Sequence, residues 1–548
     1  MIKKILNNKL LKSRPTESVI SAAFIITMAG IVSNVLGLFR DRMLASTFGA
    51  GDTLDVYYAA FRIPDLIYNL LILGALSAAF IPVFTGLISK DKDNEAWKMA
   101  SDIANLAIVC IIILSALLAL FAPWLMRILT PGFPPEKMAS VILFTRVMFL
   151  SPLFLGISGI MGGILTSLKH FLIYSIAPLL YNLGIIFGIG VLVRFMGPIG
   201  LAWGVVLGAF LHMSLQYFTV KNLGFKHSFR FLGAWKNKEV RQVLRLMFPR
   251  MAGIAVNQFN LMIITIFAST LAAGSLAIFN FSTNLQSVPL SVFGISFSIA
   301  VFPALSTFAA RGEKEKFVQA FSETFRQIMF FVIPLSVFML VLRAQIVRVV
   351  LGAGKFDWSD TILTFQCLGI FVLSLFAQSA VQLLARSFYA LQDTKTPFYV
   401  AIVTEAVNIL AVILLIGRVQ VLGLAIAFSL ASFVQMFLLL FILRTRFENL
   451  DDKKIISSIS KIAGASFVAG LAIQATKYLV AAAIDLDRFV DVLAQLAISG
   501  AVGVGIFLAI CYALKLDEFV LFKSSLSRKL FKGKLAAIAE STEEVSGI

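Results

Sequence analysis

The chain has 548 residues, of which 59% are hydrophobic and only 14% are charged. The core of a water-soluble protein of this length could not bury so many apolar residues, so the composition excludes a water-soluble protein. The net charge of +18 would suit nucleic acid, but the basic residues are spread over polar breaks between apolar stretches. That distribution is typical of membrane topology rather than of DNA binding.

Apolar stretches of about twenty residues recur from Val19 to Leu514, which predicts an all-α polytopic membrane protein. The basic segment before them is expected to stay as a cytoplasmic tail, because the apolar run that follows is too long for a signal peptide. We expect about 14 transmembrane helices, over residues 20–47, 54–88, 97–129, 138–167, 171–195, 199–220, 243–270, 275–309, 317–350, 360–388, 397–417, 421–443, 456–483 and 488–514.

The distribution of Lys and Arg predicts the orientation of these helices. Alternate breaks, counted with both tails, hold 30 basic residues on one side and 7 on the other. Basic loops stay in the cytoplasm, so both termini are expected there. The C-terminal tail reads as a basic amphipathic helix on anionic lipids, and a solvated tail without a role is the alternative.

A repeat divides the chain. The string "ASTFGAG" at 45–51 returns as "ASTLAAG" at 268–274, and Asn182 and Asn408 follow the same period. Six spans separate the copies, which predicts two parallel six-helix bundles plus two C-terminal helices, an arrangement that commonly encloses a central substrate site. The expected parts are a tail (1–18), the first bundle (19–220), a basic linker (221–242), the second bundle (243–443), helices 13 and 14 (444–514) and a cytoplasmic amphipathic tail (515–548).

Charges cluster near the first repeat copy. Asp55, Tyr58, Arg62, Asp65 and Asn69 are spaced three and four apart, so they form one stripe on a helix. The second copy lacks these charges, so we expect them to serve a ligand rather than the scaffold. With Arg40 they predict a cationic cavity for an anionic head group, because guanidinium groups match phosphate oxygens. The structural alternative is two internal ion pairs, from Arg40 to Asp55 and from Arg62 to Asp65.

Other buried polar residues give weaker signals. Arg146 either joins the cavity or reaches outward. Glu405, with Thr404 and Asn408, is a candidate site for a coupling cation, Na⁺ or H⁺. No metal site, disulfide or other cofactor is expected, because the three cysteines and three histidines form no pair or ligand motif. No P-loop is present, the loops are too short for a catalytic domain, and we expect a transporter rather than an enzyme.

Several motifs together resemble one family. The strings "GLFRDRMLASTFGAGDTLDVYYAAFRIPDL", "GALSAAFIPVF", "FPALS", "GKFD" and "FYALQDTKTP" are similar to those of the MurJ (MviN) lipid II flippases of the MOP exporter superfamily. The resemblance implies a monomeric inner-membrane protein that moves the undecaprenyl-pyrophosphate-linked peptidoglycan precursor outward by alternating access. It also implies that spans 13 and 14 form a groove for the lipid tail.

The resemblance assigns binding roles to Arg40, Asp41 and Asp55, which match the family pattern. Five positions depart from it. Asn34 and Asn284 replace basic residues, Tyr68 and Asn69 stand where many members have two arginines, and Leu73 replaces a common Glu. Arg62 and Arg146 supply part of the lost charge, or the head group differs. The alternatives are a flippase for another polyprenyl-linked glycan, a drug or cation antiporter, and a lipid-sensing scaffold that does not transport.

Overall fold

The computed structural model describes residues 19–71, 77–225, 227–228, 237–486, 488–521 and 523. Every regular element in these ranges is helical, which confirms the prediction of an all-α protein. Nine helical stretches of the described residues are long and apolar enough to cross a membrane, or ten if a pair bent by 45° at Ser374 counts as one span. The number of fourteen crossings stays a prediction.

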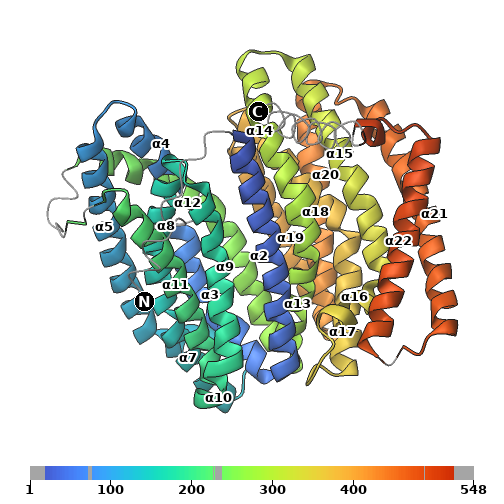
Figure 1. Ribbon diagram of the computed structural model, residues 1–548, viewed down its shortest axis with the longest axis horizontal. Helices are drawn as coiled ribbons and strands as arrows, with labels where there is room; N and C mark the ends of the chain where they lie inside the picture. The colour runs from blue at the N-terminus through green and yellow to red at the C-terminus, as the bar shows by residue number, and fades with distance from the viewer. Residues whose placement is uncertain are drawn as a thin grey trace, which may run out of the picture. The chain divides into compact units, whose positions relative to one another are not determined.

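The described helices fall into two compact units. Unit 1 runs to Asn284 and adds Val350–Thr364 and Val412–Leu424. Figure 1 labels most of its helices, which are α2 (Val19–Phe48), α3 (Asp52–Tyr68), α4 (Ser77–Ile88), α5 (Asp93–Leu120), α6 (Ala122–Leu129), α7 (Pro135–Met148), α8 (Leu150–Ser167), α9 (Phe171–Phe187), η2 (Gly188–Leu192), α10 (Val193–Met196), η3 (Gly197–Ile199), α11 (Gly200–Asn222), α12 (Lys238–Ser269) and most of α13 (Ser275–Pro289).

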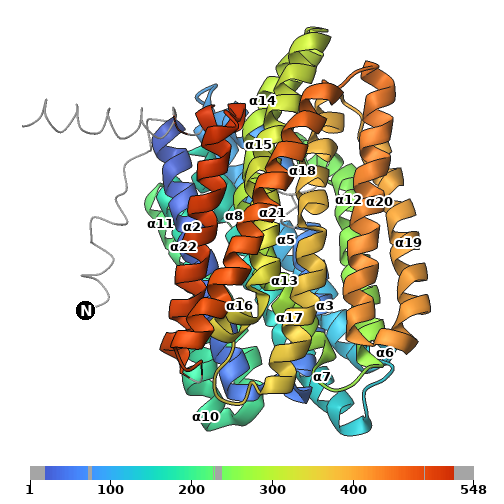
Figure 2. The same cartoon turned by 90° about the vertical axis from the view of Figure 1, so that its right-hand side faces the viewer.

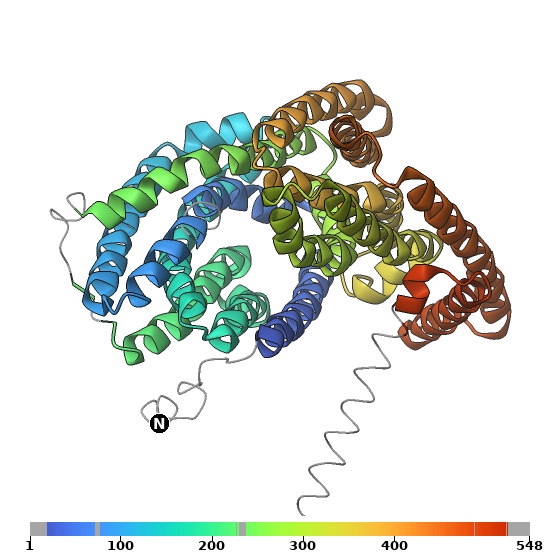
Figure 3. The ribbon, with the colours of Figure 1, turned by 90° about the horizontal axis from the view of Figure 1, so that it is seen from above.

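Unit 2 contains the remaining elements, except for the start of α17, the end of α19 and the start of α20, which belong to unit 1. Figure 2 shows α21 and α22 side by side at the surface of unit 2. Figure 3 views many helices of each unit close to end-on. The elements are η5 (Leu290–Ile295), α14 (Ser296–Ala310), α15 (Lys314–Val341), α16 (Arg343–Val350), α17 (Trp358–Leu373), α18 (Leu375–Ala390), α19 (Lys395–Val419), α20 (Val421–Phe447), α21 (Asp452–Ala483) and α22 (Phe489–Ala513).

Several predicted helices are broken in the structure. The predicted helix 97–129 stops at Phe121, where α6 starts with Pro123 in its first turn. The predicted helix 138–167 breaks at Phe149, shortly before Pro152. Proline removes a backbone donor and clashes with the preceding turn, so a helix that meets it bends or restarts.

Glycines join α9 and its continuation η2 closely to α11. A Cβ atom on Gly184 would lie 2.2 Å from the Cα of Gly208, and one on Gly188 would lie 2.6 Å from the Cα of Gly204. No side chain fits in these spaces, so the two backbones touch directly. Close approach of this kind holds helices together where lipid gives no hydrophobic drive for association.

Some predicted parts lie outside the described residues. These are the N-terminal tail over 1–18, most of the C-terminal tail (524–548) and residues 229–236 of the basic linker. The predicted division at residues 221–242 therefore stays a prediction.

Candidate functional site

Unit 1 holds a cavity of about 460 Å³. Its walls come mainly from α2, α3, α9 and α13, with single contributions from α8 and α11. The lining residues are Arg40, Leu44, Tyr57, Tyr58, Phe61, Arg62, Asp65, Tyr68, Asn69, Leu155, Pro178, Tyr181, Ile185, His212, Asn280 and Asn284. The structure therefore brings together Arg40, Arg62, Asp65, Tyr68 and Asn284 of the predicted site.

Arg40 is held in a network on one wall of the cavity. Its Nε and Nη2 donate to Asp41 Oδ1 at 3.0 and 2.8 Å, and its Nη1 donates to Asn182 Oδ1 at 3.0 Å. Asn284 Nδ2 donates to the other oxygen of Asp41 at 2.9 Å. Asp41 is only 2% exposed, so it lies behind the arginine and orients its guanidinium. Much of the Arg40 charge is thus balanced within the protein.

Arg62 has different partners. Its Nε donates to Thr265 Oγ1 at 2.8 Å and its Nη2 donates to Asn280 Oδ1 at 3.2 Å. Both acceptors are neutral, and no ion pair of Arg62 occurs within the part of the chain that the structure describes. The predicted alternative, in which Arg62 pairs with Asp65 and Arg40 with Asp55, is therefore wrong. Arg62 is 8% exposed, and Asp65 attracts it electrostatically without forming an ion pair with it. A buried cation whose hydrogen bonds all go to neutral acceptors favours an anionic ligand.

Tyrosines and an acid complete the walls. Tyr57, Tyr58, Tyr68 and Tyr181 line the cavity together with Asp65. The hydroxyl of Tyr58 is buried and makes no hydrogen bond to any described residue. His212 also lines the cavity, and behind it Ser158 Oγ lies 2.6 Å from His212 Nδ1 and donates to Gln216 Oε1 at 2.9 Å. The cavity thus offers both charge and neutral hydrogen-bonding groups, as a ligand with an anionic part and a glycan or peptide part would need.

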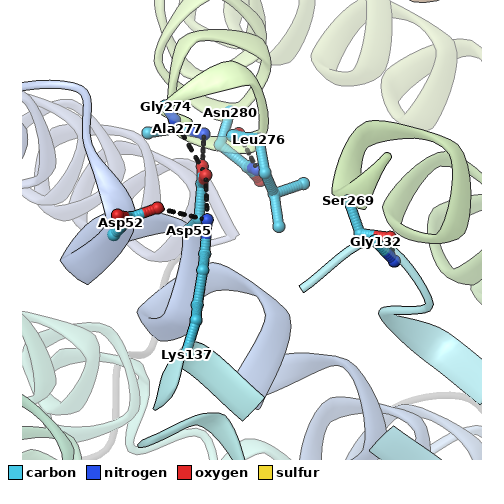
Figure 4. Close-up of polar contacts among 9 residues, drawn as sticks. All are labelled: Asp52, Asp55, Gly132, Lys137, Ser269, Gly274, Leu276, Ala277 and Asn280. Atoms are coloured by element: carbon cyan, nitrogen blue, oxygen red, sulfur yellow. Dashed lines mark hydrogen bonds and ion pairs between the residues drawn. The ribbon is translucent and has the colours of Figure 1, made fainter. Parts of the chain in front are cut away.

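Asp55 does not line the cavity. It is 3% exposed, and its carboxylate accepts from Lys137 Nζ at 2.8 Å and from the backbone N–H groups of Gly274 and Ala277 at 2.8 and 3.1 Å (Figure 4). Lys137 Nζ also donates to Asp52 at 2.7 Å. Gly274 and Ala277 lie just before and within the first turn of α13, where an anion interacts favourably with the free N–H groups of a helix.

The two repeated turns meet at this point. Gly274 has φ +87°, and a Cβ atom there would lie 1.8 Å from the carbonyl oxygen of Ala50. Ala50 N donates to Asp360 Oδ2 at 2.8 Å, and Lys355 N donates to Ser46 O at 2.9 Å. We call these contacts the turn junction, made of residues 46–55, Lys137, 270–277 and 351–360. It joins four parts of the chain that are far apart in the sequence.

The remaining predicted residues lie elsewhere. Asn34 is on α2 but is not part of the cavity lining. Arg146 is exposed and donates its Nε to the Ala119 carbonyl at 3.1 Å, so it has the outward position that the sequence left open. In unit 2, Thr404 donates to Val400 O, and Asn408 is 1% exposed with no hydrogen bond from its side chain to the described residues. Glu405 is half-buried on the same helix.

Three contributors to the site were not predicted from the sequence. These are Lys137, Asn182 and His212, of which the sequence analysis names only Asn182, as a residue that follows the repeat period. The position of Lys137 at the start of an apolar helix was a usable signal, since a lysine there must find a partner or reach the interface. Among the described residues, no group of three or more His, Cys, Asp or Glu side chains could hold a metal.

Comparisons with known proteins converge on one family. The profile of the family described as lipid II flippase MurJ matches residues 44–493. A probable lipid II flippase MurJ from Bdellovibrio bacteriovorus is 30% identical over 439 residues, which are 78% of this chain and 82% of the relative. One from Vibrio cholerae is 29% identical over 441 residues, with 77% and 82% covered.

Solved structures share the fold. A lipid II flippase MurJ in an inward closed conformation matches with a TM-score of 0.74 and 23% identity, over 90% of this chain and 98% of the other. An inward-facing multidrug resistance MATE family transporter of the MOP superfamily matches with a TM-score of 0.65 and 15% identity, over 79% and 99%. At these identities the structural matches establish the architecture alone.

Proposed function

The chain belongs to the lipid II flippase MurJ family, and from this premise we propose that it moves lipid II from the inner to the outer leaflet of the bacterial inner membrane by alternating access. The observation that carries the proposal is the pair of arginines, Arg40 and Arg62, on the walls of one cavity. The anionic part of the substrate is a pyrophosphate, whose oxygens suit guanidinium donors.

We assign different roles in phosphate binding to the two arginines. Arg40 already donates hydrogen bonds from Nε and Nη2 to Asp41 and from Nη1 to Asn182, so it contributes a fixed, oriented positive charge. Arg62 donates only to Thr265 and Asn280, and exchanging a neutral acceptor for a phosphate oxygen strengthens the bond, since hydrogen bonds between ions exceed those to neutral partners. We therefore assign the main phosphate contact to Arg62.

The turn junction supports the alternating-access part of the proposal. By the predicted topology, the turns at 48–52 and 270–275 lie on the outer side of the membrane. Gly274 N donates to Asp55, and Gly274 lies against the carbonyl of Ala50, so residues far apart in the chain hold the two turns together. Ala50 N also donates to Asp360. An opening toward the outer leaflet would separate the turns and break these contacts, so we propose that the turn junction closes the outer end of the pathway.

The orientation, energy source and chemistry belong to the same proposal. We propose that both termini are cytoplasmic, that the protein works as a monomer and that it catalyses no covalent step. A cation, Na⁺ or H⁺, bound near Thr404, Glu405 and Asn408 would couple transport to a gradient. The buried Asn408 amide, which has no hydrogen-bond partner in the described chain, supports this position.

The test is transport of lipid II in cells depleted of their own flippase. Arg62→Gln should lower the amount of lipid II that reaches the outer leaflet by roughly a hundredfold, because about 3 kcal/mol of charged hydrogen bonding is lost. Arg62→Lys should keep part of the activity. Arg146→Gln is the matched control, because it removes an arginine that lies outside the cavity, and it should transport as the wild type does. If Arg62→Gln and Arg40→Ala both restore wild-type growth and transport, the cavity is not the binding site.

A further inference from the structure

His212 on α11 lines the cavity of unit 1 but has no part in the phosphate contacts proposed above. Its Nδ1 lies 2.6 Å from Ser158 Oγ on α8. Ser158 Oγ in turn donates to Gln216 Oε1 at 2.9 Å, and Gln216 lies one turn after His212 on α11. Ser158 therefore links two side chains of the neighbouring helix, behind one wall of the cavity.

The residues behind His212 are buried and closely packed. Ser158 and Gln216 are each 1% exposed. Gly162, one turn after Ser158 on α8, leaves the room that Gln216 occupies, since a Cβ atom there would lie 3.3 Å from Gln216 Oε1. Buried polar side chains with satisfied hydrogen bonds hold a fixed arrangement. The imidazole of His212 is therefore held in one orientation from behind the cavity wall.

These hydrogen bonds determine which nitrogen of His212 carries the proton. A hydroxyl group has one proton, and Ser158 donates its proton to Gln216. The proton between Ser158 and His212 must therefore come from the ring, so Nδ1–H donates to Ser158 Oγ. In the neutral imidazole the other nitrogen, Nε2, then has a lone pair and no proton. Nε2 accepts no hydrogen bond from any residue in the described part of the chain, so it is available to a ligand.

A free acceptor in the cavity wall suits one part of the ligand and not another. The lone pair of Nε2 repels ionised phosphate oxygens, because both groups can only accept. It attracts a hydroxyl or an amide N–H group, which the sugar attached to the pyrophosphate carries. Tyr68 and Tyr181 line the same cavity, and their apolar rings with polar tips match a sugar, whose faces are apolar and whose edges are polar.

We infer that Nε2 of His212 accepts a hydrogen bond from a hydroxyl or amide N–H group of the sugar next to the pyrophosphate, and so distinguishes the glycan-bearing lipid from the bare polyprenyl pyrophosphate. This inference rests on the proposed function, since it requires the pyrophosphate to lie at Arg62 in the same cavity. The sugar is bonded directly to the pyrophosphate, whereas the peptide is attached farther away. Ser158 and Gln216 are positioning residues, which keep the proton on Nδ1 and leave Nε2 free to accept.

The test is native mass spectrometry of the full-length protein, titrated separately with lipid II and with undecaprenyl pyrophosphate. His212→Phe keeps a ring but removes the acceptor, so it should bind lipid II about tenfold more weakly, because a donor of the sugar is left unpaired. Its affinity for undecaprenyl pyrophosphate should stay that of the wild type. His212→Gln should recover part of the lipid II affinity, since its amide oxygen can accept. Ser158→Ala should weaken lipid II binding alone, by about threefold, because the ring proton is no longer held on Nδ1.

The matched control is His227→Phe, which removes a histidine outside the cavity lining and should bind both ligands as the wild type does. If His212→Phe weakens both ligands equally, or neither, the inference is overturned. A third ligand, the lipid-linked disaccharide without its peptide, should lose as much affinity for His212→Phe as lipid II does, and a loss confined to lipid II would overturn the assignment to the sugar.

Arg62→Gln separates this inference from the proposed function. It should weaken lipid II and undecaprenyl pyrophosphate alike, because both carry the pyrophosphate. If it weakens neither ligand, the phosphate site is wrong and the inference about His212 fails with it. If Arg62→Gln weakens both while His212→Phe changes neither, the phosphate site stands and only the inference about His212 fails.

Discussion

The cavity and the turn junction use the same kinds of side chains for different ends. Asp41 and Asp55 lie fourteen residues apart in one charged stretch, and both are 3% exposed or less. Asp41 forms its ion pair with Arg40, the residue immediately before it in α2. Asp55 takes Lys137 from 82 residues away and a backbone N–H from 219 residues away. The Arg40–Asp41 pair can therefore form within α2 alone, whereas the contacts of Asp55 exist only when distant segments meet.

The largest effect should come from removing the charge of Asp55. Asp55→Asn leaves the buried Lys137 with only the exposed carboxylate of Asp52 as a counter-charge, and removing the buried partner of an ion pair costs about 3 kcal/mol. Thermal unfolding in detergent should show this loss as a clearly lower midpoint. Asp52→Asn is the control, since its side chain is 67% exposed while it contacts the same lysine, and it should cost about 1 kcal/mol or less. Equal losses for both variants would refute a special role of the buried carboxylate.

A smaller but still large effect is expected from Gly274→Ala. The new methyl group would collide with the Ala50 carbonyl and the residue would have to keep a positive φ, at a combined cost of about 2–4 kcal/mol. Two controls separate these causes in the same unfolding assay. Gly197→Ala has a positive φ but open space, and Gly505→Ala has open space and ordinary φ. If Gly197→Ala destabilises as much as Gly274→Ala, the contact between the turns contributes nothing.

The Asp65→Asn variant tests the electrostatics of the cavity. Asp65 lies three residues after Arg62 on α3 and lines the same cavity, so its negative charge opposes an incoming pyrophosphate. Its removal should tighten binding of undecaprenyl pyrophosphate about fivefold, which corresponds to roughly 1 kcal/mol at partly screened distances. Binding to purified protein measures the change, with Asp91→Asn in an exposed turn as the control. Unchanged or weaker binding by Asp65→Asn would place the phosphate away from Arg62.

The positions of the helices could be predicted from the sequence because apolar length is set by the thickness of the bilayer. The helix predicted over 456–483 is α21 (Asp452–Ala483), and the one over 488–514 is α22 (Phe489–Ala513). The breaks at Phe121 and Phe149 were not predicted, because a hydropathy profile does not detect a helix break whose residues are themselves apolar. Pro123 and Pro152 were visible signals, but proline is tolerated inside many membrane helices.

The site could be predicted only in part. Arg62 and Asp65, which line the cavity, could be placed together because a helical period puts both on one face, and that period is local. Arg40 lies on the preceding helix and was added because it is a charge close to the first repeated turn. The partners of Asp55 could not be found in this way, since a backbone N–H carries no sequence signal and Lys137 belongs to another helix. The repeat did point to the right place: the two strings "ASTFGAG" and "ASTLAAG" are the turns that meet in the turn junction.

The direct contact between the glycines of α9, η2 and α11 also limits how this sequence can change over evolution. A single added methyl group at Gly184 or Gly188 would force two backbones apart, and no compensating change on the partner helix is available, because glycine has nothing further to remove. Neighbouring positions that face lipid have no such restriction. Phe187 and Phe210, which are 47% and 44% exposed, can be replaced by other apolar residues. Among relatives, this helix pair should therefore keep its contacting glycines and vary at its exposed apolar positions.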